Sequence, residues 1–186
     1  MAKASEQGLA KECKAPEAKS EKKVQKRSEN FKNGQWDLKY LQFVDSFIKQ
    51  SGMTLEQAAN KAGITRQTIF HWFQLDDAKI QSVVKFINAC GYKIEFALQP
   101  ISNEVGDALV TINAKAIPAT IGDKTLSFLD EAIDRYGIQR KEAAAKLGLT
   151  YTSLYYWFKH DDVFISYIYK IAEAYGLKLI INIDPK

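Results

Sequence analysis

The chain has 186 residues and a net charge of +4, and 46% of its residues are hydrophobic and 26% charged. Its two cysteines are too few for a disulfide framework or a cysteine-ligated metal centre, and no apolar run approaches the length of a membrane span. Because the first residues are polar and charged where a secretion signal needs an apolar segment, the composition predicts a soluble cytoplasmic protein.

Residues 1–34 differ in composition from the rest of the chain. Residues 1–33 hold nine Lys and Arg against five Glu, a net charge of +4, so the remainder is neutral, with 17 basic and 17 acidic residues. The absence of a helical apolar stripe predicts a disordered tail. Two roles are open for it: a polycationic arm that contacts phosphates without sequence preference, or a solubilising or targeting leader.

The first two of four short helices are predicted between residues 41 and 63. Apolar residues at helical spacing mark the first helix, which ends at Gly52. Thr54 and Gln57 have the spacing of a capping box, so they open a second helix that ends at Gly63.

Two further helices follow. Thr65 can cap a third helix that continues through Phe73. Asp76 and Asp77 then precede a fourth helix, whose N-terminus we expect their carboxylates to cap. This helix shows apolar residues at the i, i+3, i+4, i+7 spacing, namely Ile80, Val83, Val84 and Ile87.

A strand and a linker follow the fourth helix. After Gly91 the apolar period changes to two, which predicts a strand closed by Pro100. Residues 101–123 form a linker. Within it, residues 108–112 are apolar and β-prone, so we expect them to pack or to add a short strand.

The same order of elements returns 85 positions later. Aligning residues 41–100 with residues 126–185 without a gap gives 20 identical pairs out of 60. Self-similarity at a fixed offset predicts one folded unit that occurs twice, at residues 35–100 and 124–186. The expected fold is therefore mainly α, with a strand after each helical unit.

The two strands are expected to pair with each other. A lone apolar strand on a helical unit exposes an unpaired edge, which natural proteins avoid. We therefore predict an antiparallel ribbon of residues 93–98 with residues 177–183, about a pseudo-two-fold axis within a monomer. A homodimer that exchanges these strands is the alternative.

The second and third helices of each unit satisfy the requirements of a helix-turn-helix. Small residues, Ala58 and Ala59, allow the two helices to cross closely, and Gly63 tolerates a positive φ in the turn. Apolar residues after the turn bury the third helix. All of these features recur in the second unit, including Ala143, Ala144 and Gly148.

On these residues, both units resemble the lambda-repressor/Cro (XRE) helix-turn-helix family, and the strand after each unit is similar to that of antitoxin-type repressors. The resemblance implies two tandem DNA-binding modules that contact the major groove of double-stranded DNA, with the third helix as reader. The chain departs from the family because both units lie in one polypeptide, and this departure puts a palindromic operator in doubt.

The resemblance implies specific reader positions. In the first unit they are Arg66, Gln67 and His71, with Thr54 and Thr65 near phosphates and Thr68 as a further DNA-binding residue. Arg suits guanine and Gln suits adenine because both make bidentate contacts with base edges. The corresponding residues of the second unit read bases poorly, so that unit contacts the DNA backbone and thymine methyl groups or faces a protein partner; they are Tyr151, Thr152, Tyr155, Tyr156 and Lys159.

Other chemistry has little support. The tryptophan and phenylalanine pairs at residues 72–73 and 157–158 are expected in the core rather than as a stacking platform. The two histidines have no metal-ligand spacing, and no catalytic motif or cofactor-binding loop is present, so we expect a protein without enzymatic activity, metal or cofactor.

The sequence thus predicts a sequence-specific transcriptional repressor of bacterial or phage origin, associated with the nucleoid. Two alternatives are open. One is a protein-interaction module on the same fold, which the neutral folded part favours. The other is a nucleoid or virion component that binds DNA without specificity through its tail.

Overall fold

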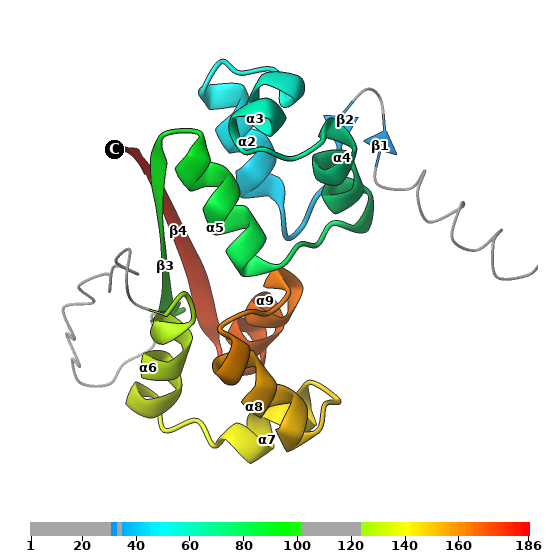
Figure 1. Cartoon of the computed structure of the whole chain (residues 1–186). Helices are drawn as coiled ribbons and strands as arrows, with labels where there is room; N and C mark the ends of the chain where they lie inside the picture. Colours follow the sequence, from blue (N-terminus) through cyan, green and yellow to red (C-terminus); the bar gives the residue numbers. More distant parts are fainter. Residues whose placement is uncertain (1–30, 33–34, 102–123) are drawn as a thin grey trace, which may run out of the picture.

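The computed structural model describes residues 31–32, 35–101 and 124–186, and within these ranges the fold is mainly helical (Figure 1). Two short strands, β1 (Phe31–Lys32) and β2 (Gln35–Trp36), precede the first half. The first half comprises α2 (Gln42–Gln50), α3 (Leu55–Lys61), α4 (Arg66–Leu75), α5 (Ile80–Ala89) and β3 (Tyr92–Pro100). The second half comprises α6 (Ser127–Arg135), α7 (Arg140–Lys146), α8 (Tyr151–His160), α9 (Ile165–Ala174) and β4 (Leu177–Pro185).

The helix starts follow the predicted capping residues. The hydroxyl oxygen of Thr54 accepts a hydrogen bond from the backbone N–H of Gln57, whose side-chain oxygen accepts one from the N–H of Thr54 at 2.8 Å. Thr65 and Thr150 cap α4 and α8 in the same way, each accepting from the N–H three residues later. These contacts satisfy N–H groups that a helix terminus leaves without an intrahelical partner.

The segment before α2 departs from the predicted tail. Phe31 and Lys32, expected to be unstructured, pair with Trp36 and Gln35 in an antiparallel hairpin. The reason is aromatic packing: the ring of Trp36 lies 4.8 Å from that of Phe31 and 5.6 Å from that of Phe73. The rest of the expected tail, residues 1–30 and 33–34, and the β-prone segment 108–112 lie outside the described residues.

The two halves are joined by an antiparallel ribbon of β3 and β4, which the sequence predicted. The register places Phe96 opposite Ile181. These two residues are also equivalent under the 85-residue offset, so an approximate two-fold axis passes between them. One face of the ribbon carries the large apolar side chains, and Phe96 is only 1% exposed there.

A second contact between the halves lies at the starts of α5 and α9. Lys79 and Phe164, also equivalent under the offset, form an antiparallel β-bridge. The N–H of Ile80 donates to the carbonyl of Val163 at 2.9 Å, and the N–H of Ile165 donates to the carbonyl of Ala78 at 3.0 Å. The two halves therefore also meet away from the ribbon.

The aspartate pairs act differently from the prediction. Asp76 does not cap the helix that follows it: it ends α4 with a left-handed backbone (φ 48°), and its carboxylate accepts from the N–H groups of Lys39, Tyr40 and Leu41. Asp161 ends α8 with φ 52° and accepts from the N–H groups just before α6. The left-handed turn, which Asp tolerates, points each carboxylate back toward the first helix of its own half.

The second aspartate of each pair does cap a helix, but in the other half. Asp77 accepts from the N–H of Ser166 in α9, at 3.1 Å, and Asp162 accepts from the N–H of Gln81 in α5, at 3.3 Å. The crossed arrangement arises because the starts of α5 and α9 lie side by side at the β-bridge (Figure 1). Within the described residues one hydrophobic core continues through both halves.

Candidate nucleic-acid interface

In the first half, α3 and α4 form a tight helical corner. Ala58 and Ala59 are 0% and 1% exposed at the contact between the helices. Gly63 has φ 66° in the turn, and the N–H of Ile64 returns to the carbonyl of Ala59 at 3.1 Å. Residues other than glycine lose free energy in this left-handed conformation. Glycine therefore suits the turn between α3 and α4.

One side of α4 is buried and the other faces solvent. Ile69 and Phe73 are buried, and Trp72 packs partly buried against Phe86, with ring centroids 5.9 Å apart. Phe158 and Trp157 also pack partly buried against the core, as predicted for all four aromatic residues.

The predicted readers of α4 are exposed to solvent. They are Arg66, Gln67 and His71, and Thr68 is half-buried in the first turn. The hydroxyl groups of Thr65 and Thr68 are 3.0 Å apart, so they form one polar end on the helix. Arg66 and Gln67 therefore have the exposure that base readout requires.

Thr54 lies at the start of α3, exposed. Its hydroxyl oxygen takes part in the capping box. Acceptance of that hydrogen bond leaves the hydroxyl proton free to donate, which is what a phosphate contact needs.

The second half repeats the corner with different exposed residues. Ala143 and Ala144 are buried between α7 and α8, Gly148 has φ 67°, and Leu154 is buried at the position of Ile69. The five predicted contact residues of α8 are all exposed: Tyr151, Thr152, Tyr155, Tyr156 and Lys159.

The exposed side of α8 is an aromatic surface. The rings of Tyr155 and Tyr156 lie 6.0 Å apart, the ring of Tyr156 stacks on that of His160 at 5.6 Å, and Lys159 lies over Tyr156. We call Tyr151, Tyr155 and Tyr156 the tyrosine surface of α8. Each of the three is about half exposed, Tyr156 the least at 48%. Large exposed apolar patches are typical of binding sites.

The sequence prediction missed two residues beside the readers. Phe70 is 41% exposed on α4, and Trp36 packs edge-on against it with ring centroids 5.0 Å apart. Phe70 is equivalent to Tyr155 under the 85-residue offset. Because Tyr155 was predicted to be a contact residue, the repeat indicated that Phe70 is exposed. Trp36 had no such signal, since its partner lies far along the chain.

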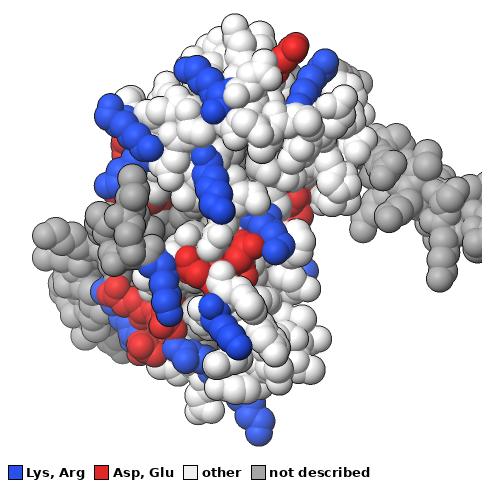
Figure 2. All heavy atoms as spheres, viewed as in Figure 1, with Lys and Arg blue, Asp and Glu red and all other residues white. Residues whose placement is uncertain are grey.

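The charges of the described residues are dispersed over the surface. On the face viewed in Figure 2, Lys and Arg side chains are scattered singly, and acidic side chains lie among them. Some are paired within the same helix: Lys49 with Asp45, and Arg135 with Glu131. Any attraction of DNA to the face viewed in Figure 2 thus depends on single basic side chains rather than on a continuous basic patch.

Comparison with known proteins identifies one part of the chain. Residues 46–96 match a helix-turn-helix family. The matched segment runs from within α2 to within β3 and contains the α3–α4 corner and all of the exposed residues of α4. Families of this kind are DNA-binding regulators, typically without enzymatic activity. Residues 46–96 are therefore similar to a DNA-binding type of domain.

Searches of curated proteins and of solved structures found no significant match. Within the described residues, no helix has the length and apolar character needed to cross a membrane. The same residues contain no group of three or more His, Cys, Asp or Glu side chains placed to hold a metal ion.

Proposed function

We propose that this protein is a sequence-specific transcriptional repressor that binds double-stranded DNA with both halves of one chain. In this proposal α4 and α8 enter neighbouring turns of the major groove, as an intramolecular pseudo-dimer, and exclude other proteins from the site. The observation that carries the proposal is the exposure of Arg66 and Gln67 on the second helix of a matched helix-turn-helix.

The joining of the two halves supports the pseudo-dimer. The ribbon and the β-bridge both pair positions that are equivalent under the 85-residue offset, such as Phe96 with Ile181. A two-fold arrangement of readers matches the two-fold geometry of duplex DNA, in which half-sites lie about one helical turn apart. In this proposal the protein represses transcription because it keeps other proteins off the DNA segment that it binds. Such a regulator acts in the cytoplasm, on the nucleoid of a bacterium.

The tyrosine surface of α8 favours a second candidate function, the binding of a protein partner. Tyr151, Tyr155 and Tyr156 expose large ring area, and such residues are enriched at protein interfaces. In this candidate the first half binds DNA and the second half recruits a protein.

A competition titration separates these functions from non-specific binding by the basic tail. A labelled duplex pool is titrated with the full chain at increasing salt, and with a variant lacking residues 1–30, which keeps Phe31 against Trp36. Specific binding predicts a site preference that survives at physiological salt in both proteins. Binding through the tail alone predicts a steep loss of affinity with salt and no preference, and it contradicts the proposal.

A further inference from the structure

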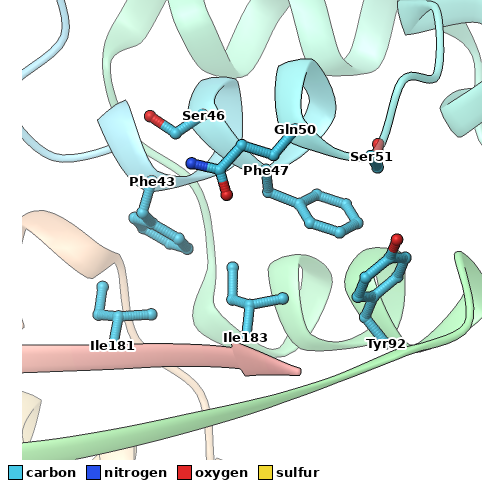
Figure 3. A pocket seen from close by; sticks show the side chains of 8 residues that line it. All are labelled: Phe43, Ser46, Phe47, Gln50, Ser51, Tyr92, Ile181 and Ile183. Carbon is cyan, nitrogen blue, oxygen red and sulfur yellow. The ribbon is translucent and has the colours of Figure 1, made fainter. Parts of the chain in front are cut away.

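A hollow of about 260 Å³ lies between α2 and the ribbon (Figure 3). Phe43, Gln50 and Ser51 line it on the side of α2. Tyr92 of β3 and two isoleucines of β4, Ile181 and Ile183, line it from below. The hollow therefore touches both halves of the chain. Its lining contains no charged side chain, so it favours an uncharged occupant.

The equivalent place in the second half is filled by an aromatic ring. There Phe96 takes the position of Ile181, and Phe128 takes the position of Phe43. The two rings stack with centroids 5.5 Å apart and planes at 22°. They are 1% and 2% exposed. Isoleucine at position 181 is smaller than the phenyl ring of Phe96. Two other lining residues change in the opposite sense, since Phe47 and Tyr92 correspond to Ala132 and Leu177 in the second half.

A hydroxyphenyl group completes the filling in the second half. Tyr136 takes the position of Ser51, and its hydroxyl donates a hydrogen bond to the backbone carbonyl of Leu98 at 3.4 Å. The equivalent of Leu98 is Ile183, which lines the hollow. The first half thus has a small serine at the position where the second half has a tyrosine.

The polar groups of the hollow suit a hydroxyl group. Figure 3 shows the Tyr92 hydroxyl at the end of the hollow near Ser51, and the Gln50 amide beside Phe43 and Phe47. The Ser51 hydroxyl donates to the carbonyl of Ile48 at 2.9 Å, which leaves its oxygen able to accept.

We propose that the hollow binds a small uncharged phenol, whose ring packs on Phe43 and Ile181 and whose hydroxyl bonds to Ser51 or Tyr92. A cavity of about 150 Å³ accommodates benzene. The hollow therefore has room for a single substituted ring. Because the occupant contacts α2 and β4 together, it holds the first half against the strand of the second half. The proposal does not depend on DNA binding.

The probe is p-cresol, which is the side chain of tyrosine as a free molecule. In methyl NMR of the full chain, p-cresol should give saturable shifts of the Ile181 and Ile183 methyl groups, with a dissociation constant of about 1 mM or below. Toluene, which lacks the hydroxyl, should bind about 2- to 10-fold more weakly. An equal affinity for toluene, or no saturable shift up to about 10 mM p-cresol, overturns the proposal.

Variants that copy the second half provide the matched test. Ile181→Phe and Ser51→Tyr should each weaken p-cresol binding about 10-fold or more, since they fill the hollow. Asn182→Phe, which adds the same ring to the other face of the ribbon, should leave binding unchanged. Ser51 ends α2 at a partly exposed position, so Ser51→Tyr keeps the test valid if Ile181→Phe does not fold. Unchanged affinity in Ser51→Tyr contradicts the proposal.

Discussion

The carboxylate of Asp77 in the first half accepts two hydrogen bonds from Ser166 in the second half, from the backbone N–H at 3.1 Å and from the hydroxyl at 2.6 Å. Burial raises the pKa of Asp77 above its ordinary value of 3.8, although hydrogen bonds from Ser166 and Ala78 act in the opposite direction. The contact thus joins the halves while it places a charge in a partly buried site.

The raised pKa predicts an unusual pH dependence for Asp77→Asn. The folded state binds the Asp77 proton more readily than the unfolded state does, so this group stabilises the fold fully below pH 3.8, and that contribution is lost as the pH rises through the folded pKa. Asparagine does not titrate. The free energy of unfolding of Asp77→Asn, measured in urea, should therefore rise relative to that of the wild type between acid and neutral pH.

Ser166→Ala is the matched comparison for this prediction. Ser166 is 7% exposed, and loss of its hydroxyl leaves the ionised Asp77 with one donor fewer. The variant should be less stable by about 1–3 kcal/mol at neutral pH. It should also steepen the fall in stability with pH. A difference between Asp77→Asn and the wild type that does not change with pH would contradict the assignment.

The ribbon is predicted to carry the stability of both halves. Phe96→Ala should cost about 3–5 kcal/mol, because it removes a fully buried ring from the core shared by the halves. Asn182→Ala, on the exposed face of the same ribbon, should stay within about 0.5 kcal/mol of the wild type.

The isolated first half, residues 34–100, should lack a cooperative thermal unfolding transition as a monomer near that of the full chain. Such a melt, or a strand-exchanged dimer of the full chain in light scattering, would contradict the intramolecular ribbon.

Arg66→Ala and Gln67→Ala are predicted to relax base preference at one position each. The loss of discrimination should be about 1–3 kcal/mol at the base pair that each side chain contacts. Both residues are exposed, so the unfolding free energy should not change. Lys178→Ala, an exposed charge on the ribbon, is the control. Equal weakening on all DNA sequences would show that the two side chains contact only phosphate.

The two halves are predicted to contribute unequally to binding. The double variant of Tyr151→Ala and Tyr156→Ala should lower DNA affinity with little change in the preferred sequence, because tyrosine lacks the forked donors of arginine. Binding is measured by titration of the same duplex with both proteins. Unchanged DNA affinity would assign the tyrosine surface of α8 to a protein partner instead.

Local patterns predicted the helices and the two ribbon strands, whereas β1, β2 and several contacts between distant segments escaped prediction. The capping box at Thr54 follows from neighbouring residues, and the pairing of residues 93–98 with residues 177–183 follows from the repeat. The crossed capping by Asp77 does not, because its partner lies 89 residues away. The packing of Trp36 on α4 escaped for the same reason.

The site was predictable to the extent that it lies on one helix. The resemblance to the XRE helix-turn-helix family implied Arg66, Gln67 and His71, and all three are exposed. The exposure of Phe70 was missed because an aromatic residue beside buried Ile69 is usually assigned to the core. Whether α8 reads bases depends on its approach to DNA, which its own residues do not determine.

Selection of binding sites from a random duplex pool by the full chain is the most direct test of specific DNA recognition. One enriched site is expected, with strong base preference in one half-site, lost on Arg66→Ala, and tolerance in the other. Recovery of a perfect palindrome would contradict the inequality of the halves. Recovery of no enriched sequence would contradict sequence-specific DNA binding itself.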